Sequence, residues 1–119
     1  IAIEIDAGPE VLTGSTRLKA GTAQKLILNM LSTTAMIGTG KVYQNLMVDV
    51  QPTNKKLEER SKRIIMQATD CDYETAAAAF EAAGKKVKLA IVMLLTSTTK
   101  EEAEEKLSQA NGFIHHTLS

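Results

Sequence analysis

The chain contains 119 residues, of which 44% are hydrophobic and 24% are charged, a composition that is ordinary for a folded globular protein. Lysine plus arginine and aspartate plus glutamate each number 14, so the net charge of zero offers no general attraction to nucleic acid or to an anionic membrane. Aromatic residues make up only 3% of the chain, so its core has to be built from aliphatic side chains, which suits helices.

Further classes of protein are excluded by what the chain lacks. The single cysteine, Cys71, cannot form an internal disulfide and fits a reducing compartment, so we expect a cytoplasmic protein. The longest uninterrupted apolar run, Leu89 to Leu95, is too short to span a membrane, and no signal peptide pattern is visible. The first residue is Ile1 rather than Met, which leads us to expect a fragment of a longer protein.

The chain opens on a strand pattern. Ile1, Ile3 and Ile5 alternate with small or acidic residues, which predicts a strand with one buried face that ends near Pro9. A single strand is not stable alone, so this pattern also predicts a sheet whose other strands lie upstream.

A long helix is predicted from about Ala20 to Ile37, where apolar residues recur at spacings of three and four. Its apolar face is wide enough for burial on two sides. One side would cover a sheet and the other a partner subunit, while a core helix in a monomer is the alternative. Gly38 and Gly40 are expected to end the helix.

The segment after this helix is harder to assign. Leu46, Val48 and Val50 alternate with more polar residues, which predicts either a short strand or an extended loop. Thr53 or Asn54 then provides the cap of the next helix.

A helical bundle is predicted for the rest of the chain, with a third helix that is apolar almost all round and is expected at its centre. Asp72 caps the second helix and Phe80 is its one large anchor. The predicted helices are one of about fifteen residues after Asn54, then Tyr73–Ala83, Val87–Leu95, and a fourth that opens on a Thr98–Glu101 or Thr99–Glu102 capping box and runs to about Ala110. One last turn is expected within Phe113–Leu118.

The loop from Gly8 to Thr22 concentrates groups that can bind an anion. Gly14 and Gly21 permit tight backbone turns and close approach of a ligand. Hydroxyls and charged donors come from Ser15, Thr16, Arg17 and Lys19. The following helix would aim its free N–H groups and positive dipole end at the loop, which favours a phosphate site. The alternative is an ordinary loop and cap, with the two cations solvated or paired to Glu4 or Asp6.

Three long runs resemble one known family: GPEVLTGSTRLKAGTAQKLILNMLS, then GKVYQNLMVDVQPTN, then CDYETAAAAFEAAGKKVKLAIVMLLT. They are closely similar to N-acetylmuramic acid 6-phosphate etherase, of the sugar isomerase superfamily, which is related to the glucokinase regulatory protein. The resemblance covers nearly the whole chain and is to the C-terminal part of the etherase. It implies a mostly α fold, in which residues 1–54 end a sugar isomerase-type α/β domain with a strand and a long helix. Residues 55–119 would form a small UBA-like helical domain, whose loop at 69–73 lacks the Met-Gly-Phe-like patch that grips ubiquitin.

The resemblance also implies an activity. The etherase is a lyase of cell-wall sugar recycling that cleaves the D-lactyl ether of N-acetylmuramic acid 6-phosphate, yielding N-acetylglucosamine 6-phosphate and D-lactate. The route is an elimination followed by addition of water, which needs an acid and a base. The family's two catalytic glutamates are expected upstream of Ile1, so no catalytic residue is assigned here and the chain alone is expected to be inactive. Neither a metal nor a cofactor is expected.

Binding residues are also implied by the resemblance. In relatives the corresponding loop lines the sugar phosphate pocket. The residues expected to bind substrate are Gly14, Ser15, Thr16, Arg17 and Lys19. A homodimer through the helix at 20–37 is expected, and no nucleic acid or membrane partner. Two alternatives remain open: a non-catalytic sugar phosphate-binding regulator, and a free-standing helical interaction module formed by residues 55–119.

Three other features are weaker candidates. His115 and His116 lack partners at metal-binding spacing. Cys71 lies between two aspartates, which disfavours a reactive thiolate. The basic run from Lys55 to Arg63 has no interleaved aromatic residue, so a solvated helix face is expected rather than a nucleic-acid site.

Overall fold

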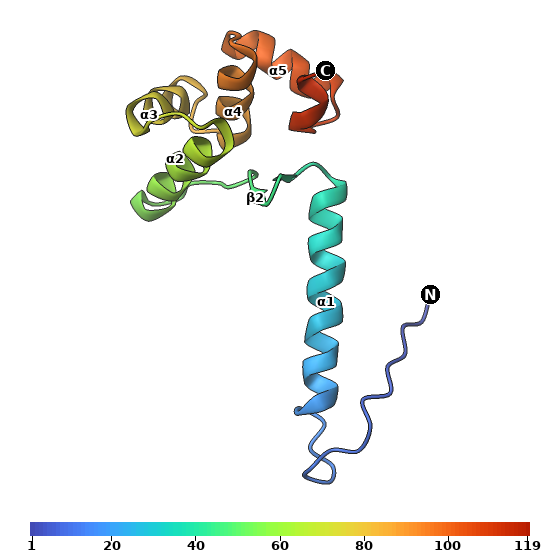
Figure 1. Ribbon diagram of the computed structural model, residues 1–119. Coiled ribbons are helices and arrows are strands. Elements are labelled where there is room, and N and C mark those ends of the chain that lie inside the picture. Colours follow the sequence, from blue (N-terminus) through green and yellow to red (C-terminus); the bar gives the residue numbers. More distant parts are fainter. The chain divides into compact units, whose positions relative to one another are not determined.

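Residues 1–119 are all described by a computed structural model, in which the chain divides into two units, residues 1–35 and residues 36–119. Figure 1 shows that most of the elements are helices. In chain order they are α1 (Lys19–Gly38), β1 (Val42–Tyr43), β2 (Leu46–Met47), α2 (Lys55–Thr69), α3 (Tyr73–Ala82), α4 (Val87–Thr96), α5 (Lys100–Gln109) and the 3-10 turn η1 (Ile114–Thr117). The mostly helical fold predicted from the sequence is confirmed.

The strand predicted over Ile1 to Ile5 is absent, and this prediction is wrong for the structure. A strand forms only where neighbouring backbone supplies hydrogen-bond partners, and the two strands of this chain pair with each other instead. Ile3 and Ile5 nevertheless line a small groove of about 270 Å³ together with α1 residues that include Ile27. The alternation thus gives the segment an apolar side toward the helix, without the hydrogen bonds of a sheet.

Helix α1 forms where the apolar spacing predicts it, but none of its residues is buried. Leu26, Leu28 and Met30 remain 53%, 57% and 64% exposed. The expectation of a core helix in a monomer is therefore not met within this chain. A helix that is apolar on more than one side and exposed along its length has a surface that other elements have to cover.

A two-stranded hairpin follows α1 and belongs to residues 36–119. It pairs Val42 with Met47 and Tyr43 with Leu46 in antiparallel register. The expected strand over 46–50 is thus confirmed only for its first two residues. Beyond it, Val48 is buried at 1% exposure and its N–H donates to the Lys41 carbonyl at 3.0 Å.

Three helices of residues 36–119, α2, α3 and α5, begin directly after a residue whose side chain caps them. The Asn54 side chain accepts from the Leu57 N–H at 2.9 Å, and the Asp72 side chain accepts from the Thr75 N–H at 2.8 Å. Thr99 and Glu102 form a complete capping box at the start of α5. Of the alternatives left open by the sequence, Asn54 and the Thr99 box are the ones used.

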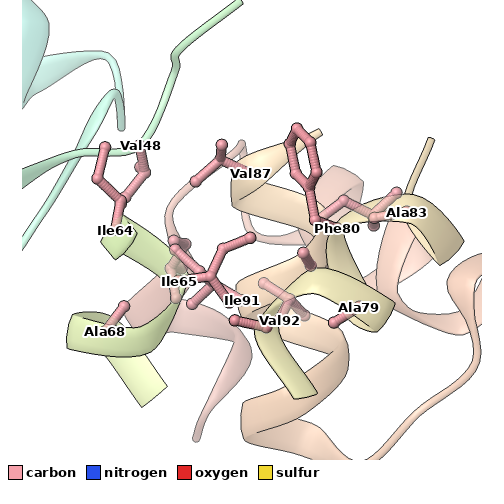
Figure 2. Close-up of a cluster of buried hydrophobic side chains, with 14 of the residues drawn as sticks. Val48, Ile64, Ile65, Ala68, Ala79, Phe80, Ala83, Val87, Ile91 and Val92 are labelled. Atoms are coloured by element: carbon pink, nitrogen blue, oxygen red, sulfur yellow. The ribbon is translucent and has the colours of Figure 1, made fainter. Parts of the chain in front are cut away.

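Helix α4 is central to this unit, because it packs against α2, α3, α5 and η1. Figure 2 shows the hydrophobic cluster around it, to which Phe80 from α3, Ile65 from α2 and Ile91 from α4 belong. All three side chains are 0% exposed, which confirms Phe80 as the large anchor of α3. The one buried polar residue of α2, Ser61, donates from its hydroxyl to the Leu57 carbonyl, so it adds no unsatisfied group to the core.

Glycine is required where the start of this unit meets its C-terminal turn. Gly40 has a φ of 69°, and a Cβ atom at this position would lie only 2.8 Å from the Gly112 carbonyl oxygen. The backbone therefore approaches closely here only because Gly40 has no side chain.

Candidate functional site

The loop before α1 is folded into successive tight turns. The Ser15 N–H donates to the Leu12 carbonyl at 3.0 Å, and the Thr16 N–H donates to the Gly14 carbonyl at 3.1 Å. Gly14 has a φ of 84°, a left-handed conformation that glycine adopts without strain. These turns place the hydroxyl residues Ser15 and Thr16 directly before the helix.

The N-terminus of α1 is occupied by a side chain of the protein itself. One carboxylate oxygen of Glu10 accepts from the Lys19 N–H and the other accepts from the Ala20 N–H, each at 3.0 Å. The Ala20 hydrogen bond, followed by that of Lys19, holds the pKa of Glu10 below its usual range. An anionic side chain at this position is also favoured by the positive end of the helix dipole.

The next two N–H groups of α1 are also paired. The Gly21 N–H donates to the Thr16 carbonyl at 2.7 Å, and the Thr22 N–H donates to the Leu18 carbonyl at 3.1 Å. The first four amides of the helix therefore all have partners within the chain. The expectation that free helix amides point at a ligand is wrong for this structure, so an anion bound by this loop would contact side chains instead.

The predicted binding residues are close together and their charges are available. Ser15 is half-buried, while Thr16, Arg17 and Lys19 are exposed. The ion pairs of the structure all lie within residues 41–104, so neither cation forms one, although the charge of Lys19 acts on the Glu10 carboxylate. The alternative of a salt bridge to Glu4 or Asp6 is therefore not observed. Two hydroxyls and two cations thus follow one another in the short segment from Ser15 to Lys19, and neither cation forms an ion pair.

A second concave surface lies in residues 36–119 and was not predicted from the sequence. This groove of about 620 Å³ is bordered by the extended segment 48–53, the start of α4 and two residues of α5. Lysines line it, but Lys85 pairs with Glu58 at 2.6 Å and Lys86 pairs with Glu104 at 3.2 Å. No local motif marks the groove, because its walls come from three separate parts of the chain.

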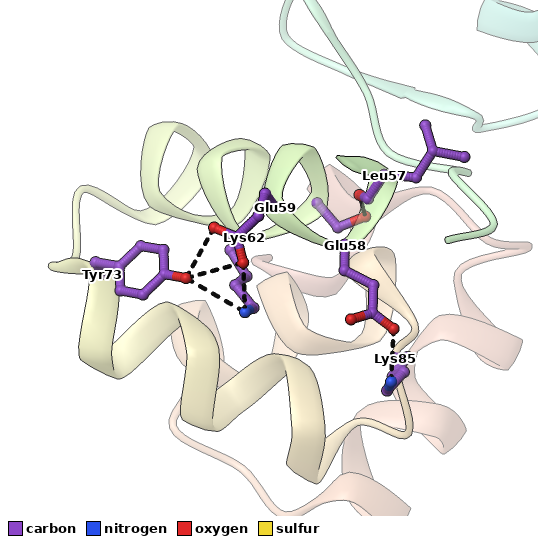
Figure 3. Close-up of polar contacts among 7 residues, drawn as sticks. Leu57, Glu58, Glu59, Lys62, Tyr73 and Lys85 are labelled. Carbon is purple, nitrogen blue, oxygen red and sulfur yellow. Dashed lines mark hydrogen bonds and ion pairs between the residues drawn. The ribbon is translucent and has the colours of Figure 1, made fainter. Parts of the chain in front are cut away.

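Polar contacts between α2 and α3 use part of the basic run, as Figure 3 shows. The Tyr73 hydroxyl donates to Glu59 at 2.8 Å, and the Lys62 ammonium pairs with the same carboxylate at 2.8 Å. The Lys62 ammonium also lies 5.4 Å from the centroid of the Tyr73 ring. The hydrogen bond from Lys62, then that from Tyr73, lowers the pKa of Glu59, and the bond to Glu59 raises the pKa of Lys62. This cluster links two helices and shows no feature of a binding site.

The weaker candidates do not assemble into a site. The His115 and His116 rings lie 4.5 Å apart between centroids, and no group of three or more His, Cys, Asp or Glu residues is placed to hold a metal ion. Cys71 is half-buried against the hydrophobic core. None of the helices has both the length and the apolar character needed to cross a membrane.

Comparison with known proteins shows strong similarity to one kind of enzyme, although no family pattern matches the chain. A protein of Enterococcus faecalis named N-acetylmuramic acid 6-phosphate etherase 2 is 71% identical over 117 residues, which are 98% of this chain and 40% of that protein. The N-acetylmuramic acid 6-phosphate etherase of Oenococcus oeni is 70% identical over 118 residues, 99% of this chain and 40% of that protein. The etherase 2 of Lactiplantibacillus plantarum is 64% identical over all 119 residues, again 40% of its length.

These comparisons confirm the resemblance identified from the sequence. The chain resembles the C-terminal part of N-acetylmuramic acid 6-phosphate etherases, and it spans 40% of the length of the curated relatives that it matches.

Proposed function

We propose that this chain is part of an N-acetylmuramic acid 6-phosphate etherase of the cytoplasm, which takes part in the recycling of cell-wall sugar. This lyase would convert N-acetylmuramic acid 6-phosphate to N-acetylglucosamine 6-phosphate and D-lactate, without a metal or a cofactor. The observation that carries the proposal is the identity of 64–71% to proteins of that name over nearly every residue of the chain. The acid and the base of the elimination are not assigned to any residue of this chain.

The role proposed for the loop is to bind the sugar phosphate. Its side chains supply hydrogen-bond donors from hydroxyls and two positive charges that form no ion pair, which are the groups that a phosphorylated sugar requires. The substrate-binding residues would be Gly14, Ser15, Thr16, Arg17 and Lys19. Arg17 is the residue best suited to the phosphate, because its planar guanidinium can donate two parallel hydrogen bonds.

The domain organisation is proposed from the same resemblance. Residues 1–54 would complete a sugar isomerase-type α/β domain, and residues 55–119 would form a UBA-like helical domain. The packing of α4 against α2 and α3 supports an independent helical core for the second part. In this reading the exposed apolar surface of α1 is covered on one side by the sheet of the first domain.

The other side of α1 is proposed to form a homodimer interface through residues 20–37. A full-length etherase that carries this chain is expected to sediment as a dimer at about 100 µM protein. At that concentration a dimer with a dissociation constant of about 1 µM is almost fully formed. Met30→Glu is expected to shift it toward the monomer, because Met30 is 64% exposed and a charge cannot be buried at an apolar contact without cost. A protein that stays monomeric before substitution would rule out this interface.

The activity itself is tested by a chimera. The 117 residues of the Enterococcus faecalis etherase that match this chain are replaced by the matching residues of this chain, and release of D-lactate is measured. We expect a turnover number within about tenfold of the parent enzyme, because the exchanged parts are 71% identical. The 119-residue chain alone is expected to release no D-lactate.

The controls of the chimera experiment separate an active etherase from a regulatory protein that binds the sugar phosphate without turnover. The parent enzyme with the same 117 residues deleted gives the background, and an assay with a chelator tests the independence from metal. A folded chimera that binds the sugar phosphate without turnover would contradict the proposed activity and favour a regulatory protein.

A further inference from the structure

The cap of α1 differs from the other side-chain caps in how far along the chain it reaches. Helices α2, α3 and α5 are capped by the residue directly before each of them. The carboxylate at α1 comes instead from Glu10, which lies nine residues before Lys19 and ten before Ala20. The cap therefore closes a loop, and that loop contains the candidate binding residues.

Closing the loop determines where its side chains lie. Between Glu10 and Lys19 the backbone makes turns of its own, and the Thr16 carbonyl accepts from the Gly21 N–H at 2.7 Å. These backbone bonds link residues 12–18 to the first turn of the helix, and the two hydrogen bonds of Glu10 add the contacts that join the start of the loop to it. Arg17 lies inside this closed segment, two residues before the helix begins.

The same carboxylate also keeps other anions from the end of the helix. A phosphate at the amides of Lys19 and Ala20 would have to displace Glu10 and would meet its negative charge at close range. The ligand is therefore recognised by side chains of the loop, on a backbone whose shape is already set.

We propose, on the premise of the function proposed above, that Glu10 is a positioning residue that holds the sugar phosphate loop closed against α1 and reserves the helix N-terminus for itself. It does not touch the reacting atoms. It acts through Ser15, Thr16 and Arg17, whose placement depends on the closed loop.

The closed loop is tested first in the 119-residue chain, without any reference to activity. Amide hydrogen exchange is measured by NMR at Lys19 and Ala20. We expect Glu10→Ala to speed exchange at these two amides by about tenfold, since each loses a charge-assisted hydrogen bond. Glu4→Gln is the control, because it neutralises an exposed carboxylate nearby in the chain and should leave both amides unchanged. Unchanged exchange in Glu10→Ala would overturn the proposal.

The effect on binding is tested in the chimera described above. Glu10→Ala is expected to raise the KM for N-acetylmuramic acid 6-phosphate about tenfold, while kcat changes by less than about twofold, because the loop binds but does not react. Glu10→Gln keeps one acceptor oxygen and should restore part of the loss. Added acetate should lower the raised KM of Glu10→Ala but not that of the unsubstituted protein, because acetate can occupy the position of the missing carboxylate.

The outcomes of the two experiments can be told apart. A chimera without turnover before substitution would contradict the proposed function, and the exchange experiment would still decide whether Glu10 closes the loop. If the Lys19 and Ala20 amides are protected in the unsubstituted chain but Glu10→Ala leaves the KM of the chimera unchanged, Glu10 closes the loop without affecting binding. That result would overturn the positioning role. If Glu10→Ala and Glu10→Gln raise KM equally and circular dichroism shows that α1 unfolds in both, Glu10 is only a structural cap of the helix. That result would also overturn the positioning role.

Discussion

Replacing Phe80 by alanine is expected to lower the free energy of unfolding of residues 36–119 by about 3–5 kcal/mol. The Phe80 side chain is 0% exposed and belongs to the hydrophobic core of a unit in which α3 packs against α2 and α4. Its neighbours Ala76 and Ala79 on α3, and Ala83 directly after that helix, are too small to fill the space that the ring leaves. The cost therefore combines lost burial of an aromatic ring with a cavity that the helices close only in part.

Urea unfolding followed by tyrosine fluorescence measures this loss. The chain has no tryptophan, and both tyrosines, Tyr43 and Tyr73, lie in residues 36–119, so the signal reports on this unit. Phe80→Leu is expected to cost less than Phe80→Ala, because it keeps most of the apolar volume. Ala78→Ser changes an exposed position of the same helix and should stay within about 0.5 kcal/mol of the unsubstituted protein. A loss below about 1 kcal/mol for Phe80→Ala would show that the ring does not anchor the core.

Replacing Arg17 by alanine is expected to weaken transition-state binding in the chimeric etherase by about 1.5–3 kcal/mol, a loss of roughly 10- to 150-fold in kcat/KM. The side chain of Arg17 is exposed and pairs with no carboxylate of the chain. Its removal therefore breaks no ion pair of the folded protein, and the loss can be assigned to the phosphate of the substrate. The measurement is the steady-state rate of D-lactate release against substrate concentration.

Arg17→Lys tests the geometry of that contact. Lysine keeps the charge but not the planar fork, so an intermediate loss is expected. Lys25→Ala removes an exposed cation further along α1 and controls for the general effect of charge. If Arg17→Ala and Lys25→Ala both leave kcat and KM unchanged, Arg17 is not part of the sugar phosphate site.

The helices of residues 55–119 could be predicted closely because their signals are local. Asn54, Asp72 and Thr99 each cap the helix that follows directly, and the hydrogen bond of each cap spans only three residues. Gly84 and Gly112 lie just beyond α3 and α5 and have a φ of 65° and 80°, respectively. Such signals act within one turn of the chain, so they are readable without knowledge of the packing.

The candidate binding residues could also be recognised from the sequence, but the arrangement around them could not. Hydroxyls and cations next to a helix start are a local pattern, and the structure does place Ser15, Thr16 and Arg17 together before α1. The role of Glu10 as the cap of α1 was not predicted. A cap that lies nine and ten residues from its N–H donors depends on the path of the loop between them. The groove bordered by segment 48–53 was missed for the same reason.

The sequence by itself determined where α1 to α5 form, that Asp72 caps α3 and which family the chain resembles, because spacing, local caps and long similar runs are properties of neighbouring residues. Only the tertiary structure decided that Ile1–Ile5 forms no strand, that α1 stays exposed and that Glu10 occupies the helix N-terminus. Each of these outcomes depends on whether a distant part of the chain supplies a hydrogen-bond partner or an apolar surface, and periodicity cannot report that.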